Sequence, residues 1–145
     1  MATLTIKAAT FNTGVVMDFV GDELEKHGLS VDLHPEILIG VEEVFVNIAY
    51  YAYEPSQDGY VDLSVTINEN AVIQFEDSGQ PFNPLEGDAP DLDTPIMERE
   101  IGGLGIHFVK NMMDKVEYVY ADGKNILTIT KDVSKNAMSK QSKVN

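Results

Sequence analysis

Strict alternation between apolar and polar side chains over residues 60–67 constrains the fold more than any other feature of this chain. Every second residue there is Val, Leu or Ile, and a second apolar segment, residues 71–76, follows the short connection Asn68-Glu69-Asn70. Successive side chains of a strand point to opposite faces, so this alternation predicts a half-buried strand. The two segments together predict a β-hairpin with one face against a core.

Similar patterns place the remaining elements. Gly28 is a natural stop for a first helix, Asp32 is expected to cap the second, and Asp122-Gly123 is typical of a hairpin turn. The expected strands cover residues 2–7, 116–120 and 125–131, and the expected helices cover residues 12–27, from Pro35 to about Tyr53, and 104–112.

This order of elements indicates the fold class. Strands clustered between helices predict an α/β protein of the α+β kind, a two-layer sandwich with helices on one face of a mixed, mostly antiparallel sheet. The 145 residues suit one domain. We expect that domain to cover residues 1–132 and the polar segment 133–145 to be a disordered tail.

Composition limits the classes of partner. The formal net charge of −14 repels phosphate backbones, so direct binding of nucleic acid through a basic surface is not expected. The absence of cysteine excludes disulfides and thiolate metal sites. No secretory signal is visible at the first residues, and no apolar stretch reaches the ~20 residues that span a bilayer. The expectation is a cytoplasmic protein that does not enter the membrane.

Glu43 and Asn47 lie four residues apart in the expected second helix, which places them on one face of it. A carboxylate beside a carboxamide oxygen supplies the hard ligands that suit Mg²⁺ together with water and phosphate. The carboxylate can also accept a proton from an attacking hydroxyl or water. The alternative is a polar flank of an ordinary surface helix.

Asp77 and Gly79 stand where the second arm of the hairpin enters a loop. An ionised carboxylate only accepts hydrogen bonds, so Asp77 can select an amino group such as the exocyclic amine of adenine. Gly79 has no Cβ and allows a flat base to approach the backbone. The alternative is a common Asp-Ser-Gly turn.

A run of glycines, Gly102-Gly103-Leu104-Gly105, precedes the third helix. Unobstructed N–H groups at a helix start, together with the helix dipole, form a phosphate site that needs no basic side chain. Lys110 and Arg99 are the cations near this site that can neutralise a terminal phosphate. The alternative is a flexible hinge at a helix cap.

Together these segments resemble the GHKL ATPases, the superfamily of the ATP-binding domains of gyrase, mismatch-repair proteins and histidine kinases, over about residues 37–113. The resemblance implies the Bergerat fold, with Glu43 as base, Asn47 on magnesium and Asp77 against adenine. Glu43-x-x-x-Asn47 looks like the N box and Asp77-Ser78-Gly79 like the G1 box. Gly103-Leu104-Gly105, with Gly102 just before it, looks like the G2 box. The expected binding residues for ATP are Asn47, Asp77, Gly79, Gly102, Gly103, Leu104, Gly105 and Lys110.

Within that superfamily the chain resembles the bacterial anti-sigma-factor serine kinases. The likeness lies in the small size and in the phrases Asp-Ser-Gly-Gln-Pro-Phe-Asn-Pro (77–84) and Gly-Gly-Leu-Gly-Ile-His-Phe-Val-Lys (102–110). It implies a serine/threonine kinase that uses ATP and Mg²⁺, phosphorylates a STAS-type antagonist protein, can bind a sigma factor, and is a homodimer.

Two features keep other functions open. Pro81 stands where these proteins usually have a second glycine, and the expected lid, residues 80–101, is short and very acidic. One alternative is a nucleotide-gated binding module that captures a sigma factor or another regulator with little phosphotransfer. Another is a degenerate relative that binds no ATP.

Overall fold

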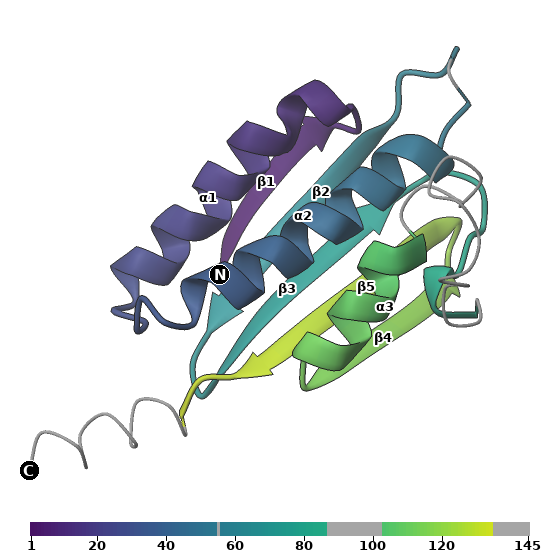
Figure 1. Ribbon diagram of the computed structural model, residues 1–145. Helices are drawn as coiled ribbons and strands as arrows, with labels where there is room; N and C mark the ends of the chain where they lie inside the picture. Colours follow the sequence, from purple (N-terminus) through teal and green to yellow (C-terminus); the bar gives the residue numbers. More distant parts are fainter. Residues whose placement is uncertain (55, 87–102, 135–145) are drawn as a thin grey trace, which may run out of the picture.

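The computed structural model describes residues 1–54, 56–86 and 103–134, and these form a sheet with a layer of helices on one face (Figure 1). The predicted two-layer α+β sandwich is confirmed, and the elements agree with the expected ranges to within a few residues. The helices are α1 (Thr13–Lys26), α2 (His34–Tyr51) and α3 (Gly103–Met112), with short 3₁₀ turns η1 (Thr10–Asn12) and η2 (Pro84–Glu86). The strands are β1 (Ala2–Lys7), β2 (Tyr60–Ile67), β3 (Asn70–Asp77), β4 (Lys115–Ala121) and β5 (Lys124–Asp132).

The sheet has the strand order β1-β2-β3-β5-β4, and all four pairings between these strands are antiparallel. The expected mixed sheet is therefore corrected to an antiparallel one among the described strands. The predicted turn at Asp122-Gly123 is confirmed, since both residues have positive φ, 56° and 77°. The last strand, β5, lies between β3 and β4, and this insertion pairs Asn125 directly with Asp77. Two residues far apart in the sequence therefore meet at the end of β3.

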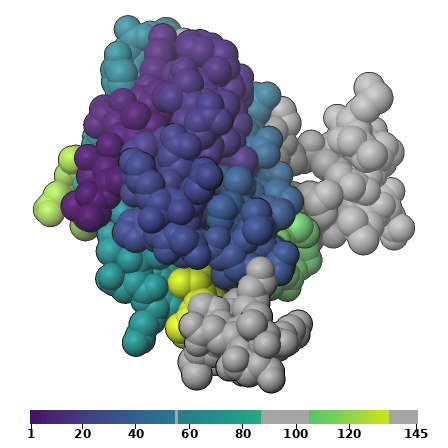
Figure 2. All heavy atoms as spheres, turned by 90° about the vertical axis from the view of Figure 1, so that its left-hand side faces the viewer, coloured from purple at the N-terminus to yellow at the C-terminus, as the bar shows by residue number. Residues whose placement is uncertain are grey.

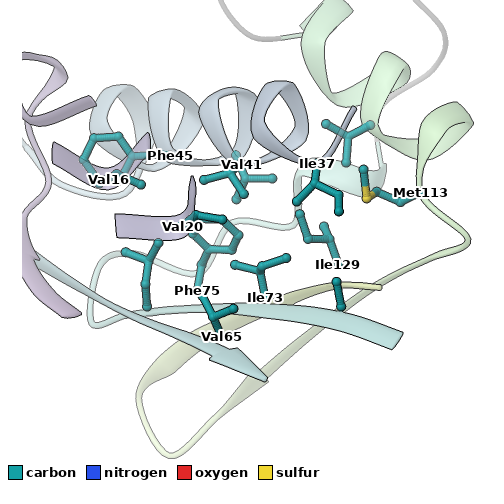
Figure 3. Close-up of a cluster of buried hydrophobic side chains, with 14 of the residues drawn as sticks. Val16, Val20, Ile37, Val41, Phe45, Val65, Ile73, Phe75, Met113 and Ile129 are labelled. Atoms are coloured by element: carbon teal, nitrogen blue, oxygen red, sulfur yellow. The ribbon is translucent and has the colours of Figure 1, made fainter. Parts of the chain in front are cut away.

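The core lies between the helices and the inner face of the sheet (Figure 3). Phe45 of α2 and Phe75 of β3 are at most 1% exposed, and each fully buried side chain of this size contributes about 1.5–3 kcal/mol. The alternating apolar residues predicted for β2 point into this core. The other labelled members are Val16, Val20, Ile37, Val41, Val65, Ile73, Met113 and Ile129.

The connection between α1 and α2 confirms one expected helix signal and corrects another. Gly28 has φ +68° and ends α1, with Leu29 N–H donating to the Leu24 carbonyl, as in a Schellman motif. The prediction that Asp32 caps α2 is wrong, because the residue before the helix is Leu33, which makes no side-chain cap bond. Residues 31–33 form a turn that leads directly into α2, so Asp32 lies inside this turn and not at the cap position.

Helix α3 packs closely on α2. At Gly40 of α2, an added methyl group would lie 3.1 Å from the Cε of Met113, which follows α3, so the absent side chain allows the contact. Figure 2 shows the side of the molecule that lies on the left in Figure 1, where the purple and blue residues of α1 and of the start of α2 occupy much of the surface.

The chain continues in the fold past the expected domain boundary at 132. Val133 is 6% exposed and belongs to the core, and the N–H groups of Val133 and Ser134 both donate to the carbonyl of Glu69. The rest of the expected tail, residues 135–145, lies outside the described residues. Within the described ranges, no helix combines the length and apolar character needed to cross a bilayer.

Candidate active site

A pocket between the two layers brings together side chains from α2, α3 and three strands. It lies at the end of the sheet where β3 stops, and its empty space, including the part open to solvent, is ≈ 380 Å³. Its walls are largely apolar, as in most sites for small molecules. The polar side chains that line it are Asn47, Asp77, Tyr118 and Asn125.

Asp77 lies in this pocket with only 5% of its surface exposed. Its Oδ1 accepts hydrogen bonds of 2.9 Å from the N–H of Gly79 and from Nδ2 of Asn125. Burial raises the pKa of the Asp77 carboxyl, and these two hydrogen bonds partly offset that effect. Its Oδ2 makes no hydrogen bond within the described part of the chain, which leaves it available to an amino group in the pocket.

Gly79 allows the loop after β3 to lie against the end of α2. A methyl group added to Gly79 would sit 2.1 Å from the carbonyl oxygen of Ala52, which as backbone cannot move aside. The next residue, Gln80, donates its N–H to the same oxygen at 2.9 Å and its side-chain amide to the carbonyl of Tyr51 at 2.8 Å. A side chain at position 79 would separate these segments and move Asp77.

Asn47 of α2 lines the same pocket and is 5% exposed. No hydrogen bond joins its carboxamide to another residue in the described ranges. Among the described residues no side-chain nitrogen or oxygen that is fully shielded from solvent lacks a hydrogen-bond partner, so the unpaired carboxamide of Asn47 opens into the pocket, where a ligand can bind it. The amide oxygen is a suitable donor for Mg²⁺ with phosphate and water as the other ligands.

Glu43 lies one turn before Asn47, against the first turn of α3. A methyl group added to Gly105 would lie 1.8 Å from Oε2 of Glu43, so this carboxylate contacts the backbone of α3 at the glycine. Burial, and to a lesser degree the neighbouring charge of Glu42, raises the pKa of Glu43. Among the described residues Glu43 forms no ion pair, so its carboxylate remains free to accept a proton.

The other expected binding residues are only partly placed. Gly103 and Leu104 begin α3 and belong to the same first turn as Gly105. Gly102 and Arg99 lie outside the described residues. Lys110 lies in the last turn of α3, where its ammonium donates to the carbonyl of Leu85 at 2.8 Å. Lys110 therefore contacts η2, at the start of the expected lid. It does not lie at the glycine end of α3, where a phosphate is expected.

Two polar residues of the pocket, Asn125 and Tyr118, were absent from the sequence prediction. Asn125 is 5% exposed, donates to Asp77, and accepts from the hydroxyl of Tyr118. One signal was visible, because asparagine is depleted in strands and Asn125 falls in an expected strand. Its contact with Asp77 could not be predicted from the sequence pattern, because the pairing of β3 with β5 follows from the strand order of the whole sheet.

The comparison with known families decides the identity of this fold. Residues 6–131 match the family model described as a histidine kinase-like ATPase domain. The chain belongs to this family. The predicted membership of the GHKL superfamily is therefore confirmed.

Individual relatives are similar over most of the chain. It is 30% identical over 138 residues to the serine-protein kinase RsbW of Halalkalibacterium halodurans, covering 88% of this chain and 80% of the relative. It is 29% identical over 89 residues to the anti-sigma F factor of Priestia megaterium, covering 60% of each chain. These relatives confirm the predicted resemblance to anti-sigma-factor serine kinases.

A solved structure supports the fold. A crystal structure of the RsbU and RsbW domains of a Mycobacterium tuberculosis protein superimposes with a TM-score of 0.61 and 14% sequence identity. The match covers 92% of this chain and 33% of the other, so this chain spans about a third of the length of that crystallised chain. At this identity the likeness concerns the fold alone.

Proposed function

We propose that this protein is an ATP-dependent serine/threonine kinase of the anti-sigma-factor type, which phosphorylates a STAS-domain antagonist protein. The observation that carries the proposal is the contact between the Glu43 carboxylate and Gly105 at the first turn of α3, beside the pocket of Asp77. It brings a free carboxylate to a helix start that suits phosphate. The names of the similar proteins, serine-protein kinase RsbW and anti-sigma F factor, support the same activity.

The donor set of the pocket fits ATP and Mg²⁺. Oδ2 of Asp77 would accept the amino group of adenine, and the N–H groups at the start of α3 would bind phosphate. Asn47 would hold Mg²⁺ through its amide oxygen, since its carboxamide has no other hydrogen bond within the described residues. The metal ion neutralises charge on the phosphates when bound.

Glu43 is proposed as the group that orients the substrate hydroxyl and accepts its proton. Burial raises the pKa of Glu43, which makes its carboxylate a stronger base than that of an exposed glutamate. Positioning and electrostatic stabilisation supply most of the catalysis in phosphoryl transfer, so the geometry at Gly105 matters more than basicity.

The test measures transfer of the γ-phosphate from ATP to a serine of a cognate STAS-domain protein. Glu43→Gln is expected to lower the rate by about 10²-fold or more, the range for loss of a general base. Glu42→Gln is the matched control, because Glu42 is the adjacent, exposed glutamate. The charge of Glu42 is the smaller cause of the raised pKa of Glu43, so the rate of this variant should stay close to that of the wild type. Equal transfer by the wild type and Glu43→Gln would contradict the kinase assignment.

The partners belong to the same proposal. We infer a STAS-domain antagonist as substrate, a sigma factor as a second partner, a homodimeric assembly, and activity in the cytoplasm, where ATP is supplied. The likeness to a protein named anti-sigma F factor supports the sigma factor. Sedimentation of the purified protein tests the dimer, which is wrong if the mass is that of one 16.0 kDa chain.

The same likeness also supports a second function, a nucleotide-gated module that captures a sigma factor with little phosphotransfer. Under this alternative, Glu43→Gln leaves sigma-factor capture intact and Asp77→Asn abolishes it. Phosphotransfer by the wild type that is lost in Glu43→Gln would favour the kinase instead. Isothermal titration with Mg-ATP distinguishes both functions from a degenerate relative, which would bind no nucleotide.

A further inference from the structure

Asn125 has more hydrogen-bond partners than any other side chain of the pocket, and they come from two functionally different segments. Its Nδ2 donates to Oδ1 of Asp77 at 2.9 Å and to the carbonyl of Gln80 at 2.8 Å. Its Oδ1 accepts from the N–H of Phe82 at 3.1 Å and from the hydroxyl of Tyr118. One buried carboxamide thus contacts both the expected adenine acceptor and the first residues of the lid.

These partners allow only one orientation of the carboxamide. The carboxylate of Asp77 and the carbonyl of Gln80 only accept hydrogen bonds, so they must face the NH₂ group of Asn125. The backbone N–H of Phe82 only donates, so it must face the oxygen. A flipped carboxamide would leave buried groups unsatisfied at about 1–3 kcal/mol each.

The same contacts restrict the lid. Gln80 and Phe82 are both held by Asn125, and the residue between them is Pro81, whose ring fixes φ and which has no N–H of its own. A proline at this position restricts the free segment, so less conformational entropy is lost when both contacts form. The departure from the usual glycine is consistent with a segment held in one conformation.

We propose that Asn125 is a positioning residue for nucleotide selection: it turns Oδ1 of Asp77 away from the ligand, leaves Oδ2 as the acceptor for the adenine amino group, and holds the start of the lid beside it. Tyr118 supports this role by donating to the oxygen of Asn125. The inference rests on the proposed binding of ATP. It adds that selection of the nucleobase depends on a residue of β5 that need not contact the nucleobase.

The test compares the affinities for Mg-ATP and Mg-ITP by isothermal titration. ITP has a ring carbonyl in place of the adenine amino group, so an ionised Asp77 should reject it. Wild-type protein is expected to prefer ATP by about 10²-fold or more, because a site built for a hydrogen-bond donor is left unpaired by the analogue. Failure of the wild type to bind Mg-ATP would contradict the proposed function itself.

The decisive variant is Asn125→Asp, which keeps the size and shape of the side chain. Two adjacent carboxyl groups would share a proton, and a protonated Asp77 can donate to the carbonyl of ITP. The ATP-to-ITP preference should therefore fall by about 10-fold or more. Asn68→Asp, at the exposed hairpin tip at the other end of β3, makes the same change of charge and should leave the preference unchanged.

A purely structural role for Asn125 predicts a lower melting temperature with an unchanged preference. The inference is overturned if Asn125→Asp folds, binds ATP and prefers it over ITP as strongly as the wild type does. If Asn125→Asp does not fold, Tyr118→Phe provides the test, since it removes only the hydroxyl, which contacts Asn125 and the backbone N–H of Phe82. A preference reduced by about threefold supports the inference, and an unchanged preference overturns it.

Discussion

Replacing Gly105 by alanine tests the contact on which the proposed mechanism depends. The added methyl group would lie 1.8 Å from Oε2 and 2.5 Å from Cδ of Glu43, whereas ordinary contact begins at 3.4 Å. The carboxylate must therefore retreat from 1.8 Å to 3.4 Å, a shift of about 1.6 Å. A misplacement of about 1 Å at a reacting group can cost 10²-fold in rate, so kcat should fall by about that factor.

The fold should tolerate this substitution. The clash involves the flexible end of one side chain, and alanine favours a helix over glycine by about 1 kcal/mol. The assay is the initial rate of phosphate transfer at saturating ATP, with the melting temperature measured in parallel. Gly21→Ala in α1 is the matched control, because nothing lies within 4 Å of the added methyl group, and it should keep full activity.

A double-mutant cycle separates displacement of Glu43 from blocked access of phosphate to the glycine. If Gly105→Ala acts through Glu43, it should add little to the loss already caused by Glu43→Gln. Additive losses in the double variant would refute the reasoning, and so would wild-type activity of Gly105→Ala. Either result would mean that the carboxylate at Gly105 is not the working base.

Three further predictions follow from the same geometry. Asp77→Asn should weaken Mg-ATP binding by about 10–100-fold in calorimetry, because a hydrogen bond to a charged acceptor is lost. The same substitution should not lower the free energy of unfolding at pH 7. Burial raises the pKa of Asp77, so the folded state loses stability as the pH rises from the unfolded-state pKa through the folded-state pKa. Asparagine does not ionise and removes this cost. Because the pKa of Glu43 is raised, kcat should fall as the pH drops through that pKa, with a midpoint above 4.5. The residual activity of Glu43→Gln should not show this acidic decline in its pH profile. Gly79→Ala should destabilise the fold by about 1–3 kcal/mol in denaturant titration, because its methyl group meets the backbone of Ala52 and not a movable side chain; an unfolding curve equal to that of the wild type would contradict this close approach.

Local pattern was sufficient for most elements because each depends on neighbours in the sequence. Alternation specified the strands, and the four-residue spacing of Glu43 and Asn47 placed both on one side of α2. Gly28 was a reliable helix stop, since only its own backbone had to adopt positive φ. The cap at Asp32 failed because capping depends on the path by which the chain enters the helix.

The site itself depended on contacts that no local pattern encodes. Asp77 meets Asn125, 48 residues away, because β5 enters the sheet between β3 and β4, and this strand order follows from packing of the whole sheet. Glu43 meets Gly105 because α3 packs against α2. The amino-acid sequence by itself therefore determined the elements and the chemical groups that the proposed ATP site uses. Only the tertiary structure decided which of those groups face one another, because such contacts form between segments whose separation along the chain carries no periodic signal.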